Sequence, residues 1–161
     1  MKKSTNQYAA VYKAELEKGD IQVAYKRLVK YVMALKAQLA KGEMRRYHFG
    51  NVSPGYMDYT HFPFFDDFLR DKKLRFGIVL NHRKLRFELW LMGQNAKVQQ
   101  EYWELLKNTV WNRERTDMPK YSVLEAVVED TPDFDDLNML SGKIEKNALY
   151  LTNAVLQNIP K

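Results

Sequence analysis

Two acidic side chains stand in settings where carboxylates can do chemistry. Glu88 lies in the middle of an alternating stretch, on the same side as Arg86 and Trp90 and opposite a row of leucines. If other residues cover that side, the carboxylate needs a partner and becomes a candidate for a functional site. On an open side, Glu88 and Arg86 form a surface ion pair of little energetic weight. Asp58 is the second candidate, because it precedes Tyr59 in a stretch rich in aromatic residues.

Aromatic side chains supply the second kind of candidate site. Large amphipathic rings line pockets and interfaces, and basic residues interleaved with rings can bind nucleic acid through phosphate contacts and stacking. The same pattern also fits a solvated turn with core tryptophans, which is the simpler interpretation. The basic candidates are Arg83, Lys84, Arg86 and Lys97. The candidate ligand-binding residues are Tyr56, Tyr59, Phe62, Arg86, Trp90, Gln99 and Trp103.

Other chemistries lack their residues. The chain has no cysteine, which excludes disulfides, thiol nucleophiles and cysteine-ligated zinc. Phosphate-binding glycine loops, dinucleotide fingerprints and nucleophile elbows are also missing. The acids around Asp133 lack the glycine and distal glutamate of a calcium loop, and they fit the start of a helix instead. The three histidines are His48, His61 and His82, and no two of them have the spacing of a metal-binding pair. We therefore predict neither a metal nor a cofactor.

The net charge of +6 is unevenly distributed. Residues 1–120 carry 23 basic against 13 acidic side chains, whereas residues 121–161 carry 3 against 7. A basic body favours anionic partners such as nucleic acid, although the acidic C-terminal part can neutralise it within the fold. The first residues lead into an amphipathic stretch rather than an apolar signal core, and no run has the length of a membrane span. We therefore expect a cytoplasmic protein.

The hydrophobic periodicity predicts one α+β domain over residues 1–161. Apolar residues at helical spacing predict two N-terminal helices, a middle helix and a long C-terminal helix with a heptad-like stripe. Strict alternation predicts a mostly antiparallel sheet of about four to five strands, with the helices packed on it. The expected helices cover 5–18, 21–40, 96–109 and a segment opening at Thr131; the expected strands are a loose hairpin within 44–68, then 74–80, 85–91 and 121–129.

Several local signals predict where these helices begin and end. Ser4 has a glutamine three residues later, which is the spacing of a capping box. Gly19 is a typical C-terminal stop, and Asp20 can cap the next helix at once. Asn95 can cap the middle helix, and Thr131 can cap the last one with a proline in its first position.

Five segments together resemble an uncharacterised bacterial family, a domain of unknown function. The resemblance covers nearly the whole chain and implies no activity, so no residue role is transferred from it. The segments are Gly55–Thr60 (GYMDYT), Asn81-His82 leading into Arg86–Asn95 (RFELWLMGQN), Val98–Trp103 (VQQEYW), Pro132–Leu137 (PDFDDL) and the opening Tyr12–Asp20.

The predicted order of elements is also similar to the PD-(D/E)xK nucleases. That resemblance implies a helix, three antiparallel strands, a helix and a strand, with magnesium held by two acids and an activating lysine. Asp58 and Glu88 would stand in for the acids, but Trp90 occupies the place of the lysine. Gln99 and Tyr102 follow on the next helix, at a spacing that differs from the nuclease pattern. The departure puts activity in doubt, whereas a nucleic-acid-binding module remains compatible with the fold.

Three hypotheses follow from the sequence. The preferred one is a non-catalytic binding or regulatory domain with an aromatic-lined pocket, whose partner is nucleic acid or protein. The alternative is a metal-dependent, nuclease-like enzyme or a degenerate nucleic-acid-binding relative of one. The third is assembly through the C-terminal helix, although its stripe is better explained by packing on the sheet. The sequence leaves open whether the chain is an enzyme, and whether it is a monomer or a homodimer.

Overall fold

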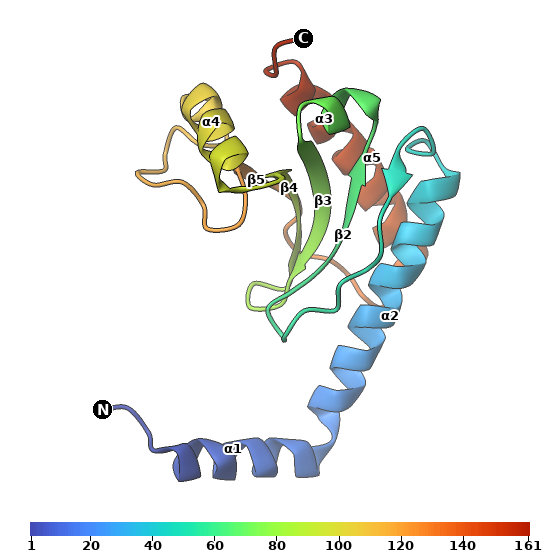
Figure 1. Ribbon diagram of the computed structural model, residues 1–161. Helices are drawn as coiled ribbons and strands as arrows, with labels where there is room; N and C mark the ends of the chain where they lie inside the picture. Colours follow the sequence, from blue (N-terminus) through green and yellow to red (C-terminus); the bar gives the residue numbers. More distant parts are fainter.

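The computed structural model describes residues 1–161 as an antiparallel sheet with α2 and α5 packed on one face (Figure 1). The five strands follow one another across the sheet in the order β1-β2-β3-β4-β5. Each strand pairs antiparallel with the next, so the predicted α+β class and strand number are confirmed. The elements are α1 (Thr5–Lys18), α2 (Asp20–Lys41), β1 (His48–Phe49), β2 (Tyr59–Phe65), α3 (Asp67–Asp71), β3 (Leu74–Asn81), β4 (Arg86–Gly93), α4 (Ala96–Leu106), β5 (Leu124–Glu129) and α5 (Leu137–Leu156).

The inner face of the sheet carries the hydrophobic core. Alternate side chains of each strand point to this face, and α2 and α5 cover it. Burying these chains removes apolar surface from water, which is the main favourable contribution to folding. Fully buried inner-face residues include Phe62, Phe64, Phe76, Ile78, Leu80, Phe87, Leu89 and Leu91.

The stripe of α5 packs against the sheet, in agreement with the preferred interpretation of the sequence. Leu140, Ile144 and Ala148 are buried in the same core as the inner-face residues. The Tyr31 hydroxyl of α2 lies 2.9 Å from the hydroxyl of Ser141, which links the two covering helices. The heptad-like pattern therefore serves this domain rather than a coiled coil.

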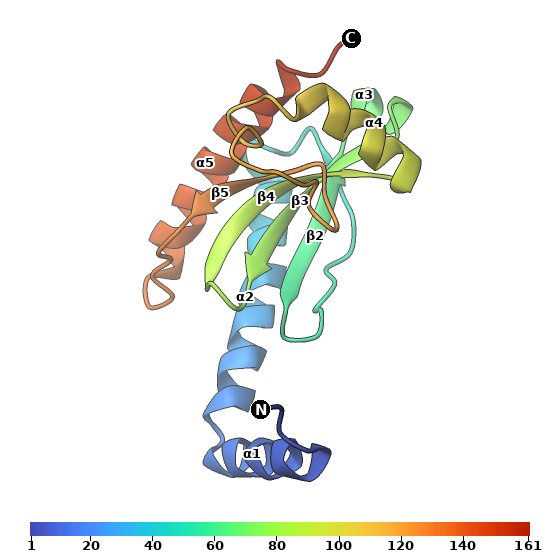
Figure 2. The same ribbon diagram turned by 90° about the vertical axis from the view of Figure 1, so that its left-hand side faces the viewer.

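The outer face of the sheet is only partly covered. Figure 2 shows α4 and the segment 107–123 crossing one end of this face, while no helix lies over the rest. Outer-face side chains include Tyr59, His61, Arg75, Val79, Asn81, Arg86, Glu88, Trp90, Met92 and Glu125. All the candidate chemistry of β4 therefore lies on the less protected side.

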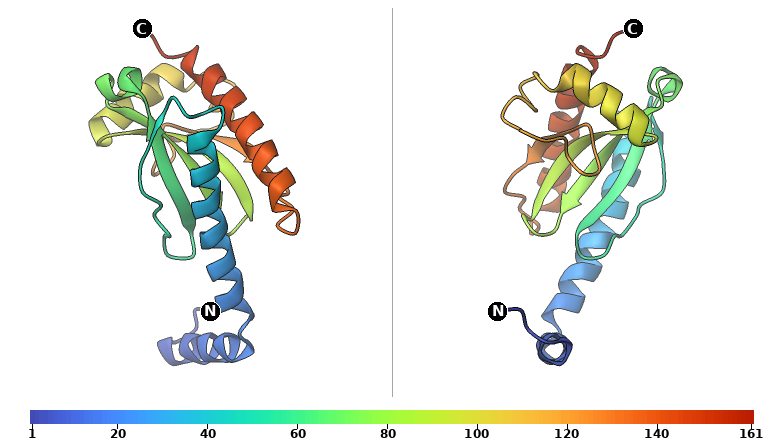
Figure 3. Two further views of the ribbon diagram at one scale, coloured as in Figure 1. Left: turned by 90° about the vertical axis from the view of Figure 1, so that its right-hand side faces the viewer. Right: turned by 60° about the vertical axis from the view of Figure 1, so that its left-hand side comes forward.

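The first helix projects from the domain. The predicted capping box is present, since the Ser4 hydroxyl accepts from the Gln7 amide and the Gln7 side chain accepts from the Ser4 amide. Gly19 ends α1 with a φ of 83°, a left-handed conformation that glycine adopts readily. No residue of α1 is buried. Figure 3 shows α1 at the far end of α2, away from the sheet.

Four local expectations are corrected by the structure. Asp20 does not cap α2, because the capping position is Gly19 and no side chain bonds there. Helix α5 begins six residues after Thr131, because a turn around Asp133 precedes it and the Asp136 carboxylate accepts from the Met139 amide. Leu85 belongs to the β3–β4 turn with a φ of 47°, rather than to β4. The short helix α3 was not predicted.

No helix in the fold is both long enough and apolar enough to cross a membrane.

Candidate binding surface on the outer face of the sheet

Glu88 is the centre of a buried polar network. The residue is only 1% exposed, although α2 and α5 lie on the opposite face of the sheet. One carboxylate oxygen accepts from Arg86 Nε at 2.6 Å and Asn81 Nδ2 at 3.2 Å, and the other accepts from Trp90 Nε1 at 2.9 Å. Strand alternation places Arg86 and Trp90 on either side of Glu88, and antiparallel pairing sets Asn81 opposite Arg86.

Three donors satisfy this carboxylate from within the protein. A buried charge is tolerated when an opposite charge and hydrogen bonds replace its hydration. Arg86 supplies the charge, and its outer nitrogen also reaches Asp130 at 3.5 Å. Because the Glu88 side chain is only 2% exposed and three donors already bind it, the geometry suits a structural carboxylate better than a general base, which must reach its substrate.

An aromatic cluster adjoins the network. The Tyr59 and Trp90 rings meet edge to face with centroids 4.9 Å apart, and Tyr121 approaches Tyr59 at 6.4 Å. Val79 and Met92 pack with Trp90 beneath the rings. Trp90 is almost fully buried, whereas Tyr121 is 55% exposed. The accessible ring surface therefore belongs to Tyr121 and Tyr59, and Trp90 supports them from below.

A second carboxylate lies beside these rings. Glu125 of β5 pairs with Trp90 across the sheet, and its side chain is 24% exposed. It accepts from the Ser122 hydroxyl at 3.1 Å and from Arg115 at 3.3 Å. Partial burial, reinforced by the negative charge of Glu88, raises the pKa of Glu125 above its usual range. Burial also raises the pKa of Tyr59, and the nearby carboxylates add to that shift.

Gln99 holds the segment that carries Tyr121. Its side-chain nitrogen donates to the carbonyls of Pro119 and Ser122, both at 3.0 Å. The start of α4 packs closely on the end of β4, because a Cβ placed on Gly93 would stand 2.7 Å from the backbone nitrogen of Gln99. Gln99 thus fixes the loop over the sheet end.

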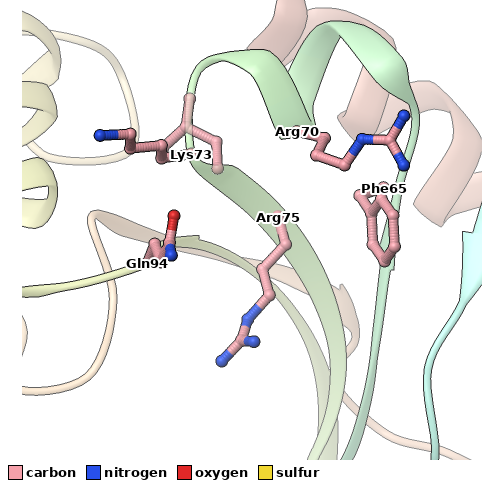
Figure 4. A pocket seen from close by; sticks show the side chains of 6 residues that line it. Phe65, Arg70, Lys73, Arg75 and Gln94 are labelled. Atoms are coloured by element: carbon pink, nitrogen blue, oxygen red, sulfur yellow. The ribbon is translucent and has the colours of Figure 1, made fainter.

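A basic pocket lies at the end of the outer face where β2 and β4 finish, beside the start of α4. It encloses about 150 Å³ between Phe65, Arg70, Lys73, Leu74, Arg75 and Gln94. Figure 4 shows the Arg75 side chain extending between Gln94 and Phe65, with Lys73 on the Gln94 side and Arg70 on the Phe65 side. Arg70 pairs with Asp67 at 2.7 Å, whereas Lys73 and Arg75 make no ion pair.

The charge of Arg75 reaches its neighbours on the sheet. Burial lowers the pKa of His61, and the positive charge of Arg75 lowers it further. His61 faces outward from β2, between Tyr59 and Phe65. The middle of the outer face therefore carries a neutral ring at neutral pH, next to an uncompensated cation.

The structure separates the candidate residues of the sequence into several places. Tyr59, Arg86 and Trp90 come together around Glu88, and Gln99 fixes the loop nearby. Phe62 is fully buried in the inner core, because a spacing of three along a strand puts it opposite Tyr59. Tyr56 is almost fully exposed in a loop, and Trp103 is buried on α4 outside both apolar clusters. The predicted aromatic pocket thus reduces to a smaller cluster.

Asp58 stabilises a turn rather than joining Glu88. Its carboxylate accepts from the backbone amides of Tyr56 at 2.8 Å and Tyr59 at 2.6 Å, and these bonds lower its pKa. Strand β3 lies between the strands of Asp58 and Glu88, so their backbones are separated laterally by about 10 Å. No group of three or more histidine or acidic side chains is arranged to hold a metal ion.

The residues of the predicted basic patch lie at opposite ends of β4 and do not form one patch. Arg83 and Lys84 are exposed in the β3–β4 turn, whereas Lys97 lies beyond the other end of the strand and approaches Glu101 at 3.9 Å. Arg86 is bound to Glu88 instead of facing a ligand freely. Sequence reasoning missed Arg75, although it is the charged residue in an otherwise apolar strand, and it missed Tyr121, Glu125 and the remaining pocket residues.

Fold and site together define an α+β domain whose outer sheet face carries a buried polar network, an aromatic cluster and a basic pocket. The chain belongs to the family described as Domain of unknown function (DUF7000), whose model matches residues 5–159. This confirms the resemblance to an uncharacterised domain family over nearly the whole chain. No curated protein and no solved structure matches the chain significantly.

Proposed function

We propose that this chain is a non-catalytic binding domain whose outer sheet face binds an anionic ligand with a flat ring, as in nucleotides and single-stranded nucleic acid. The observation that carries the proposal is a pair of cations without acidic partners, Lys73 and Arg75, on the same face as accessible aromatic rings. Phosphates are bound by such cations, and bases stack on rings of this kind.

The arrangement along the face supports a ligand with both features. On β2, Tyr59, His61 and Phe65 occupy outward positions, spanning six residues or about 20 Å. The basic pocket lies at the Phe65 end and Tyr121 at the Tyr59 end. A ligand with an anionic group in the pocket and a ring toward Tyr59 would contact both ends.

The metal-dependent nuclease alternative has weaker support. Asp58 and Glu88 are each occupied by protein donors and lie on strands that are not neighbours. Trp90 donates to Glu88 where the nuclease pattern requires a lysine. With no donor cluster for a metal, binding rather than cleavage is the function that the geometry favours.

Fluorescence anisotropy with a fluorescein-labelled single-stranded oligonucleotide tests the proposal, over about 50 to 200 mM salt. We expect binding that weakens as salt rises, and a loss of about tenfold in affinity for Arg75→Ala, the size expected for one lost charged contact. Lys143→Ala is the matched control, because it removes one exposed positive charge from α5, on the side of the inner face.

Competitors then distinguish the sources of the anion. Displacement by an unlabelled mononucleotide would identify a nucleotide-sized site, whereas displacement by longer strands alone would identify nucleic acid. Inorganic phosphate tests the pocket by itself. No binding at low salt, or equal losses for Arg75→Ala and Lys143→Ala, would contradict the proposed surface.

A further inference from the structure

Helix α1 exposes an apolar stripe that its own chain leaves uncovered. Tyr8, Val11 and Tyr12 are all exposed, at helical spacings of three and four residues. An isolated helix of this length is marginal in water, and most helical stability in proteins comes from packing an apolar face. The 14 residues of α1 therefore lack the contact that normally stabilises such a helix.

The same molecule has an apolar groove without an occupant. It encloses about 600 Å³ beside α2, between the β3–β4 turn and the start of α5. Its apolar lining includes Leu28, Tyr31, Ala34, Leu85, Phe134 and Leu137. Leu85 is 48% exposed there despite its left-handed backbone. The groove thus presents a second uncovered apolar surface.

We propose that these two surfaces cover each other in a two-fold dimer, with α1 of one copy lying in the groove of the second copy. Arg27, Lys30 and Asp135 border the groove beside its apolar residues. Helix α1 carries equal numbers of basic and acidic side chains, and its acids already pair within the helix, Glu15 with Lys18 at 2.9 Å and Glu17 with Lys13 at 3.8 Å. The exposed stripe of α1 and the groove therefore match in polarity, since both are largely apolar.

The connection between α1 and α2 explains why the occupant is a second copy. Only Gly19 separates the two helices, whereas an antiparallel pair of helices needs a connection of about two to five residues. Helix α1 projects from the far end of α2 and lies apart from the sheet and α5 (Figures 1 and 3). A two-fold axis makes the contact twice, which helps to reach the roughly 1,200 Å² that a stable interface buries.

Engineered cysteines test this arrangement without background, because the chain has none of its own. The Val11→Cys variant, with its cysteine in α1, is mixed with a second variant, either Ala24→Cys or Ala34→Cys. Ala24 and Ala34 lie at two places along the groove. One partner carries a purification tag, so a mixed disulfide dimer has its own size on a non-reducing gel. Since each chain has one cysteine, the mixed product is intermolecular. We expect it with a groove cysteine, and no more than background with Lys143→Cys on α5.

Sedimentation of the unmodified protein gives the second measurement. We expect a dimer at roughly 100 µM, and for Tyr8→Asp with Tyr12→Asp an association about a hundredfold weaker, because carboxylates would enter an apolar groove. Both positions are exposed, so the circular dichroism spectrum should be unchanged. A monomer for the unmodified chain would overturn the proposal, as would equal cross-linking to the groove and α5 cysteines.

Discussion

The two faces of the sheet are built from the same alternating strands but are stabilised differently. The inner face buries apolar side chains against α2 and α5, and the contacts there are non-directional. The outer face buries a charged network and rings with much less cover from helices. There Glu88 is as inaccessible as many inner-face residues, because its neighbours on the same face enclose it. Burial of a strand residue thus depends on its neighbours as well as on the layer above it.

This difference matters for function. Inner-face contacts tolerate changes of identity when volume is kept, since packing is their main requirement. The outer network depends on particular donors and acceptors, so a change at one partner leaves the others unsatisfied. The network orients Trp90, and the Tyr59 ring packs against Trp90 in turn. The predictions below test this contrast.

The largest effect is expected on the inner face. Phe76 is fully buried, and Phe76→Ala should lower the free energy of unfolding by about 3–5 kcal/mol through lost burial and a cavity. Urea denaturation measures this loss. Val127→Ala on the outer side of β5 is the control, since Val127 is exposed and should cost less than about 0.5 kcal/mol. Similar losses in the free energy of unfolding for Phe76→Ala and Val127→Ala would contradict the expected difference between the two faces.

A somewhat smaller loss is expected in the outer network. Glu88→Ala removes the acceptor of Arg86, Asn81 and Trp90 and should cost about 2–3 kcal/mol, because Arg86 retains some access to water. A double-mutant cycle with Arg86→Ala measures the coupling by chemical denaturation. If the double variant were as unstable as the two single losses added together, the network would not act as a unit.

The pH dependence of stability should reveal Glu125. Its folded pKa is raised, so the folded protein binds this proton more tightly than the unfolded chain does. This contribution is present at pH values below the ordinary glutamate pKa and is lost as pH rises through the raised value. Relative to Glu125→Gln, the unmodified protein should therefore be more stable near pH 4 than near pH 7. Denaturation curves at both pH values test the sign, and an unchanged difference would contradict it.

The smallest change in stability is expected at the exposed ring. Tyr121→Ala should alter the free energy of unfolding by less than about 0.5 kcal/mol, because the side chain is largely in solvent. Thermal denaturation checks this, and the oligonucleotide assay should show weaker binding by the same variant. Strong destabilisation without a binding defect would mean that Tyr121 supports the loop instead of a ligand.

Part of the site could be predicted because it depends on local periodicity. The alternation of β4 correctly placed Glu88 with Arg86 and Trp90 on one side. The same rule separates Tyr59 from Phe62, because a spacing of three residues along a strand puts the two rings on opposite faces of the sheet. Helix α1 was predicted with its correct limits because its capping box and terminal glycine act within a few residues.

The sequence by itself determined α1, α2 and α4, the presence of α5, the two central strands, the α+β class and the side on which each residue of β4 lies. These features follow from short-range periodicity and capping. Only the tertiary structure decided which side is covered by α2 and α5 and which remains open. It also brought Tyr121 to Tyr59, Glu125 to Trp90, and Arg75 beside Gln94. These contacts join residues distant along the chain, and their formation depends on strand register and loop packing, which no local pattern specifies.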